Sequence, residues 1–287
     1  MMVVWHHALG QLAATSTFIH VPPWGAYGVD LFFAISGFIM LVTTWDKPIT
    51  PMEFMQHRIR RVVPLYWVAT LFMAALVLLA PALFRATEVS VAAIAKSLFF
   101  VPYESPNWPG VARPVLLQGW SLNYEIFFYV LFSATLLVGR NWRVPIMVGV
   151  LCTLVMAGFV LHPSNYALRA YTDVRMLEFG AGMIMGRLWV MRKHTRRGGG
   201  NPVLMALGDA SYSIYLTHIF TLGALRVVWV RLVPEATMAS SIALMAASLI
   251  ASAAAGWLCY RLVERPLTQW ISKRRLVVRI EVLEGAK

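Results

Sequence analysis

Long apolar stretches constrain this chain more than any other feature of its sequence. Several of them run for about 18 residues or more with at most one charge, and a helix of that length crosses a hydrocarbon core of roughly 30 Å. In lipid a helix satisfies its own backbone hydrogen bonds, so the stretches predict an all-α bundle of transmembrane helices. The strand-like alternation that is typical of an outer-membrane barrel is absent from the sequence.

Composition agrees with a membrane protein. The chain is 59% hydrophobic and 13% charged, whereas soluble domains carry about 25% charged residues. A formal charge of +12 would suggest nucleic-acid binding in a soluble protein, but here most basic residues fall in short loops between apolar stretches. We therefore expect membrane lipid, and no nucleic acid, as a partner. Cys152 and Cys259 lack the spacing of a metal or disulfide site, and we interpret both as packing residues.

The sequence predicts about eight spans in one bundle. We expect this bundle to occupy residues 1–270, with a basic cytoplasmic tail over 271–287. The predicted spans are residues 1–12, 29–44, 62–83, 116–138, 144–161, 172–190, 203–230 and 238–260.

Charge predicts the orientation of the bundle. If the spans alternate, most of the 25 lysines and arginines lie on one side, which the positive-inside rule makes cytoplasmic. We therefore expect a multi-pass protein of the bacterial inner (plasma) membrane with both termini in the cytoplasm. The opposite side holds only Arg85, Lys96, Arg113, Arg169, Arg175, Arg226 and Arg231.

Two irregularities interrupt this pattern. The first apolar run spans only about 18 Å at roughly 1.5 Å per residue, so we expect an upstream half-helix that the chain lacks. Residues 196–201 read RRGGGN, which predicts a flexible linker between two spans.

Ionisable residues inside spans are functional candidates, because a charge in the bilayer is costly. His6 and His7 lie in the first run and point about 100° apart on a helix, so only one can face a given pocket. An imidazole there can take a proton from a hydroxyl and return it. An interfacial histidine near the membrane surface is an equally good interpretation on spacing alone.

Two acidic residues stand in later spans. Asp30 opens the second span, where it would cap the helix or interact with its dipole; a partnership with His7 is the alternative interpretation. Glu125 shares a helix face with Tyr129, four residues on, so the carboxylate has a hydroxyl neighbour. Trp120 and Tyr124 are typical of an interfacial aromatic belt.

A polar stripe follows one face of the seventh span. Ser211, Tyr215 and His218 recur at helical spacing, and hydrogen bonding between helices explains the stripe better than direct catalysis. The spacing from Gly182 to Gly186 is weak evidence for close helix contact.

Two arginines precede the third span. Arg58 and Arg61 are three residues apart on one face, a spacing that suits a phosphate or pyrophosphate. A plain positive-inside anchor is the alternative interpretation.

Six stretches in order resemble acyltransferase family 3. They cover nearly the whole chain. The sequences of residues 28–38 and 211–218 are most similar to the exopolysaccharide-production branch of that family. The six stretches are residues 3–8 (VVWHHA), 28–38 (GVDLFFAISGF), 58–66 (RIRRVVPLY), 120–129 (WSLNYEIFFY), 211–218 (SYSIYLTH) and 264–266 (ERP).

The resemblance implies an acyl-CoA co-substrate on the cytoplasmic side, acetyl-CoA by default, and a hydroxyl acceptor on an exopolysaccharide or other cell-surface glycan, or on a lipid-linked saccharide. His7 matches the family's essential histidine, and Arg58 and Arg61 match its Arg-x-x-Arg motif. Asp30 and Glu125 match acidic residues that the family carries in the stretches corresponding to residues 28–38 and 120–129. We expect no bound cofactor and no metal. Supporting roles fall to Tyr129, Ser211, Tyr215 and His218.

The chain departs from the family at both irregularities. The family's first helix carries an arginine about ten residues before the histidine, and the family has about ten spans, so we expect a pair to be missing at 198–200. A transporter or flippase for a glycan or acyl precursor is the main alternative function, because intramembrane Asp, Glu and His also mark transport pathways. An inactive shortened homologue is a third interpretation.

Overall fold

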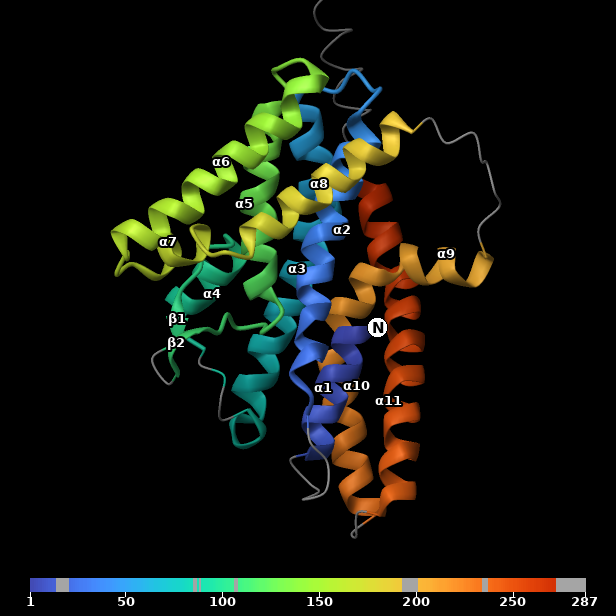
Figure 1. Cartoon of the computed structure of the whole chain (residues 1–287). Helices are drawn as coiled ribbons and strands as arrows, with labels where there is room; N and C mark the ends of the chain where they lie inside the picture. The colour runs from blue at the N-terminus through green and yellow to red at the C-terminus, as the bar shows by residue number, and fades with distance from the viewer. Residues whose placement is uncertain are drawn as a thin grey trace, which may run out of the picture. The chain divides into compact units, whose positions relative to one another are not determined.

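The structure, a computed structural model, describes residues 1–13, 21–84, 87, 89–105, 108–192, 201–233 and 237–271. These residues are mostly helical, as the apolar stretches predict, with one short two-stranded sheet (Figure 1). The elements are α1 (Met2–Ala13), η1 (Pro23–Ala26), α2 (Tyr27–Thr44), α3 (Pro51–Leu79), η2 (Pro81–Leu83), α4 (Val91–Leu98), β1 (Glu104–Ser105), β2 (Trp108–Ala112), α5 (Gly119–Thr135), α6 (Arg140–Leu161), α7 (Tyr166–Tyr171), α8 (Met176–Met191), α9 (Pro202–Asp209), α10 (Ser211–Leu232), α11 (Met238–Cys259) and the π-helical turn η3 (Tyr260–Glu264).

In the described part of the chain, five helical segments are long and apolar enough to cross a membrane: α2, α3, α6, α10 and the continuous segment Met238–Ile271. Three further predicted spans are helices of 12, 17 and 16 residues, namely α1, α5 and α8. The prediction of a membrane-spanning helical protein is therefore confirmed, and the count of about eight spans stays a prediction. The predicted linker over 196–201 and the tail over 271–287 lie almost wholly outside the described residues.

Two predicted boundaries are wrong. The span predicted over 203–230 is two helices, because α9 ends at Asp209 and Ala210 closes its last turn with bonds to the Ala206 and Gly208 oxygens. The span predicted over 62–83 belongs to a helix that begins at Pro51. A capping box explains that early start: the Thr50 hydroxyl accepts from the Glu53 amide, and the Glu53 carboxylate accepts from the Thr50 amide.

The chain divides into two compact units, which we describe separately. Unit 1 comprises residues 1–28, 60–65 and 198–287, and unit 2 comprises residues 29–59 and 66–197.

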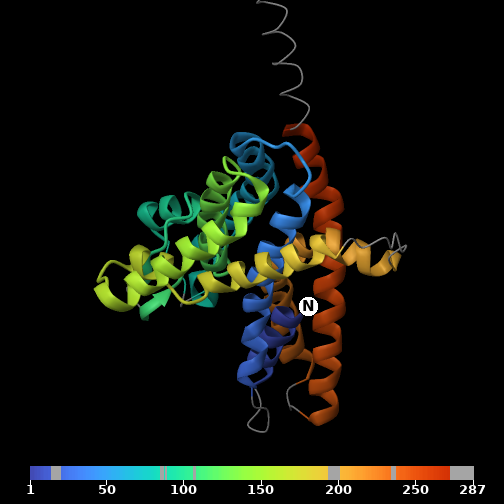
Figure 2. The same ribbon diagram turned by 45° about the horizontal axis from the view of Figure 1, so that its top comes forward.

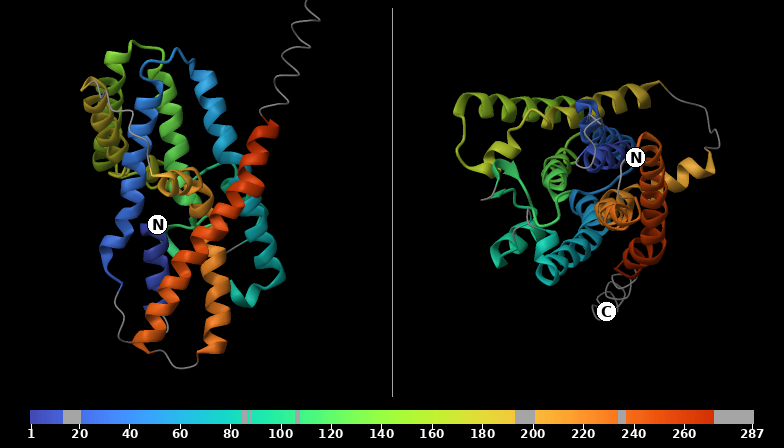
Figure 3. Two further views of the ribbon diagram at one scale, coloured as in Figure 1. Left: turned by 90° about the vertical axis from the view of Figure 1, so that its right-hand side faces the viewer. Right: turned by 90° about the horizontal axis from the view of Figure 1, so that it is seen from below.

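In unit 1, α1 packs against α10 and α11, and the last two helices lie side by side (Figures 1 and 3). Val4 on α1 and Ile214 on α10 belong to one buried apolar cluster. Gly256 brings α11 so close to α10 that an added Cβ would overlap the Ile214 side chain.

In unit 2, α6 lies beside α8 (Figure 2), and glycines allow α8 to approach α2. A Cβ at Gly182 would overlap the Ala34 carbonyl oxygen, and one at Gly186 would lie 3.2 Å from the Phe38 oxygen. The small-residue spacing therefore marks a real close contact. Stacked rings of Phe33, Phe128 and Phe179 fill the core beside it, with centroids 4.6 Å and 4.3 Å apart.

Candidate active site

Two histidines pair inside unit 1. His7 on α1 and His218 on α10 approach with 2.9 Å between His7 Nδ1 and His218 Nε2, and their rings are nearly parallel. His218 is fully buried, whereas His7 is half-buried. The structure thus joins the predicted catalytic histidine to a member of the predicted polar stripe, which sequence spacing could not do because 211 residues separate them.

The neighbouring His6 points elsewhere. Its ring packs beneath Gly25 of η1, where an added Cβ would lie 2.7 Å from His6 Nδ1. That nitrogen is buried and has no hydrogen-bond partner among the described residues. The two histidines therefore face different surroundings, as predicted, and His7 is the one whose ring nitrogen is hydrogen-bonded to a histidine of another helix.

The rest of the predicted stripe on α10 is only partly engaged. Tyr215 accepts a hydrogen bond from His218 through its backbone oxygen, and its half-buried ring lies beside the imidazole, whereas Ser211 is exposed. Two residues that the stripe does not include make long-range contacts on α10. The Tyr212 hydroxyl donates to the Val62 oxygen at 2.6 Å, and the Ser213 hydroxyl donates to the Glu264 carboxylate at 2.5 Å.

Those two contacts were missed by sequence reasoning. The sequence did indicate that Glu264 has a hydrogen-bond partner, because a carboxylate at the end of an apolar stretch needs a donor. Its partner could not be identified from spacing, since Ser213 lies 51 residues earlier.

A second polar group lies in unit 2, around Glu125 on α5. The Tyr129 hydroxyl donates to Glu125 Oε1, as their four-residue spacing predicts, and the Ser36 hydroxyl on α2 donates to the same oxygen at 3.1 Å. Glu125 is 5% exposed and Tyr129 is 3% exposed. The carboxyl group is therefore buried and accepts hydrogen bonds from both hydroxyl groups.

Arg58 belongs to the surroundings of this group. Its guanidinium lies 5.5 Å from the centre of the Phe54 ring, and Phe54 packs edge-on against Tyr129. Arg58 is also close enough for its charge to act on the Tyr129 hydroxyl. Arg61 follows one turn later on α3 and is exposed. The two arginines therefore differ in burial, although they share a helix face.

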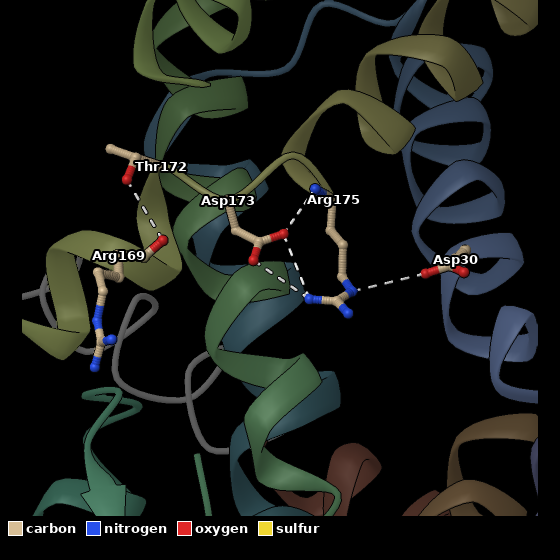
Figure 4. Close-up of polar contacts among 5 residues, drawn as sticks. All are labelled: Asp30, Arg169, Thr172, Asp173 and Arg175. Atoms are coloured by element: carbon tan, nitrogen blue, oxygen red, sulfur yellow. Dashed lines mark hydrogen bonds and ion pairs between the residues drawn. The ribbon is translucent and has the colours of Figure 1, made fainter. Parts of the chain in front are cut away.

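Asp30 has a different local role from the one predicted. Helix α2 begins at Tyr27, so Asp30 stands in its first turn and does not cap it; the capping prediction is wrong, and the dipole interaction still applies. Figure 4 shows the Arg175 guanidinium between Asp30 and Asp173, at 3.9 Å and 3.3 Å. Glu178 forms a hydrogen bond with Asp30 as well, so acidic groups and one arginine gather at the start of α2 and α8.

The structure therefore joins some of the predicted site residues in two local groups, His7 with His218 and Glu125 with Tyr129, whereas Asp30 lies in a third group with Arg175 and Glu178. His7 belongs to unit 1, whereas Asp30, Arg58 and Glu125 belong to unit 2. The predicted partnership of His7 with Asp30 stays a prediction.

Comparisons with known proteins agree on one family. The model of acyltransferase family 3, described as an acyltransferase domain, matches residues 1–201. The exopolysaccharide production protein ExoZ of Rhizobium meliloti (strain 1021) is 34% identical over 303 residues, which cover 88% of this chain and 92% of that protein. The peptidoglycan O-acetyltransferase OatA of Listeria monocytogenes serovar 1/2a is 25% identical over 189 residues, 58% of this chain and 30% of that protein. No solved structure matches the chain.

Proposed function

We propose that this chain, which belongs to acyltransferase family 3, moves an acetyl group from acetyl-CoA to a hydroxyl of an exopolysaccharide or another cell-surface glycan. Membership of the family makes it a membrane acyltransferase. The observation that carries the acceptor class is the similarity to an exopolysaccharide production protein along almost the full length of both chains. The similarity to a peptidoglycan O-acetyltransferase favours acetyl as the group and oxygen as the acceptor atom.

In this proposal His7 is the general base. Its imidazole takes the proton of the acceptor hydroxyl while the oxygen attacks the thioester carbonyl of acetyl-CoA. The new bond joins the acceptor oxygen to the acyl carbon, and the carbon–sulfur bond breaks. His7 then returns the proton to the departing CoA thiolate, so the residue is unchanged after each turnover. The pairing of His7 with a buried imidazole supports this role.

The remaining predicted residues have distinct proposed roles. Arg58 and Arg61 hold the phosphates of CoA, for which planar guanidinium groups are suited. Asp30 and Glu125 are the acidic residues of the catalytic site, and burial and hydrogen bonding of Glu125 support a precise position for its carboxyl group. We assign supporting roles to Tyr129, Ser211, Tyr215 and His218.

The proposed setting is the bacterial inner membrane. About eight spans over residues 1–270 form the catalytic bundle, and the tail over 271–287 and the N-terminus both face the cytoplasm, where acetyl-CoA is present. The acceptor is a glycan or a lipid-linked saccharide at or beyond the membrane. No metal or bound cofactor takes part in this scheme.

Mass spectrometry of the exopolysaccharide tests the proposal in cells that lack the native gene and carry a copy of this one. We expect the wild-type chain to add acetyl esters, His7→Ala to add none, and the matched variant His6→Ala to keep most of the modification. Equal membrane levels of the three proteins, measured by immunoblot, are the control.

Two results would contradict the proposal. Full acetylation by His7→Ala would remove the histidine from the mechanism. Export of a glycan that depends on the chain but carries no added acyl group would identify a transporter instead.

A further inference from the structure

The hydrogen bond between His7 and His218 has a direction that its surroundings fix. On the far side of the His218 ring, Nδ1 lies 2.6 Å from the Tyr215 backbone oxygen, and the Ile214 carbonyl also faces the ring. A carbonyl oxygen only accepts hydrogen bonds, so His218 Nδ1 carries a hydrogen. A neutral His218 therefore presents a bare lone pair at Nε2, the atom nearest to His7.

His218 is neutral for reasons of burial and charge. The side chain is fully buried on α10, a helix long enough to span the membrane, and an isolated charge there is costly. Among the described residues, the base that contacts its ring is His7. An imidazole carries no negative charge, so His7 does not stabilise an imidazolium at His218.

The state of His7 follows from that of His218. Because His218 Nε2 is an acceptor, the hydrogen in the 2.9 Å bond comes from His7 Nδ1. A neutral imidazole has one ring hydrogen, so His7 Nε2 is bare and is the atom that can accept a proton. In a Ser-His-Asp triad a buried carboxylate likewise accepts the Nδ1 hydrogen of the histidine and so leaves its Nε2 free to take a proton. Here a neutral imidazole occupies that position.

We propose that His218 is a positioning residue that holds His7 in the tautomer with a bare Nε2, an inference that rests on the proposed role of His7 as base. When the acceptor hydroxyl gives its proton to His7 Nε2, the imidazolium keeps its Nδ1 hydrogen on His218 Nε2. That bond stabilises the positive charge until the proton passes to the CoA thiolate. The neighbouring His6 lacks such support, because Gly25 covers its Nδ1.

Nitrogen NMR of the wild-type protein tests the tautomer without any measurement of activity. The full chain, labelled with ¹⁵N-histidine and reconstituted in lipid at neutral pH, should show a protonated Nδ1 and a bare Nε2 for His7, with the same pattern for His218. A scalar coupling between His7 Nδ1 and His218 Nε2 should report the hydrogen bond itself. Comparison with the His7→Ala and His218→Gln spectra identifies the signals.

Kinetics of His218 variants provides the second test. His218→Phe fills the site without an acceptor, and we expect it to lower kcat by roughly 10- to 100-fold at unchanged KM for acetyl-CoA. His218→Gln retains a carbonyl oxygen that can accept from His7 and should restore most of that loss. Thr221→Val, one turn away on the same helix, should leave kcat unchanged.

The double variant shows whether His218 acts through His7. In the double variant, the ¹⁵N spectrum should lack the His7 Nδ1 hydrogen and its scalar coupling as in His7→Ala, and acetyl transfer should stay at background, because the group being positioned is already gone. A hydrogen on His7 Nε2 in the wild-type spectrum would overturn the proposal, and so would full activity of His218→Phe. The expected spectrum together with an active His7→Ala variant would instead retain the tautomer and refute the proposed function.

Discussion

At the scale of single residues, Glu125 shows what an apolar helix requires of a carboxyl group. The side chain is almost fully buried, and both of its observed donors, Tyr129 and Ser36, supply hydroxyl groups to the same oxygen. The Tyr129 contact follows from four-residue spacing and was predictable. The Ser36 contact depends on how α2 and α5 pack, and 89 residues of sequence separate the partners.

Tyr129→Phe should destabilise the protein by about 1–3 kcal/mol, because a buried acceptor loses a hydrogen bond while the ring volume is kept. Thermal unfolding in detergent measures the change. Ser133→Ala is the matched control on α5: among the described residues that hydroxyl bonds to the Val130 oxygen in the preceding turn of its own helix, and its loss should be nearly neutral. Equal stability of the Tyr129 variant and the wild type would show that the contact contributes nothing.

Arg58→Ala should weaken acetyl-CoA binding roughly 10- to 100-fold, as expected for loss of a charge-assisted contact to phosphate. Calorimetry with the purified protein measures the affinity. Arg60→Ala removes an equal charge from a different face of α3 and should change binding little. Unchanged affinity in Arg58→Ala, or equal losses in both variants, would reject a specific phosphate site.

At the scale of helices, glycine decides how closely α2 and α8 pack. A Cβ at Gly182 overlaps the Ala34 carbonyl oxygen, whereas Gly149 on α6 has nothing within 4 Å of the same position. Sequence spacing suggested a close contact near Gly182 and Gly186, but gave no partner helix. Gly37, which meets the Phe179 carbonyl from the opposite helix, completes the contact and had no sequence signal of its own.

Gly182→Ala should therefore lower stability by about 1–3 kcal/mol, because backbone on the facing helix must move. Gly149→Ala adds the same methyl group in open space and should be neutral or stabilising by about 0.5–1 kcal/mol, as helix propensity favours alanine. Unfolding in detergent measures the stability of both variants relative to the wild type. Equal stability of Gly182→Ala and Gly149→Ala would show that α2 and α8 do not pack closely at Gly182.

Helix type was predictable from apolar runs, but the apolar runs alone did not predict where the helices begin and end. The long runs identify α2, α6 and α11 because lipid demands continuous apolar surface. The break at Ala210 escaped prediction because the apolar run continues across it, although Gly208 and Asp209 just before it have low helix propensity. The early start of α3 was present in the sequence as the Thr50 and Glu53 capping pair.

At the scale of the whole molecule, the charge bias makes a prediction about orientation. A fluorescent protein fused after Lys287 should fluoresce, and alkaline phosphatase at the same point should be inactive, because the C-terminus is predicted to be cytoplasmic. After Pro163, between α6 and α7, the fused phosphatase should be active and the fluorescent protein should be dark. Phosphatase activity at Lys287 would contradict the predicted orientation.

The candidate site was only partly readable from the sequence. Ionisable residues inside apolar stretches made His7 and Glu125 candidates, and the resemblance to the family selected His7 over His6 and added Arg58. The sequence placed His218 in a supporting stripe, but could not pair it with His7, since that pairing requires α1 to pack on α10. Packing partners depend on side-chain shape over the whole bundle, and no single motif encodes them.

The central claim is acyl transfer by this chain with His7 as its base. The most direct measurement uses purified protein in liposomes with radiolabelled acetyl-CoA and an exopolysaccharide acceptor, and follows label on the glycan over time. We predict base-labile label with the wild type and with His6→Ala, and none above background with His7→Ala. Label transfer by His7→Ala at the wild-type rate would contradict the assigned base, and no transfer by the folded wild type to any glycan acceptor would contradict the proposed function.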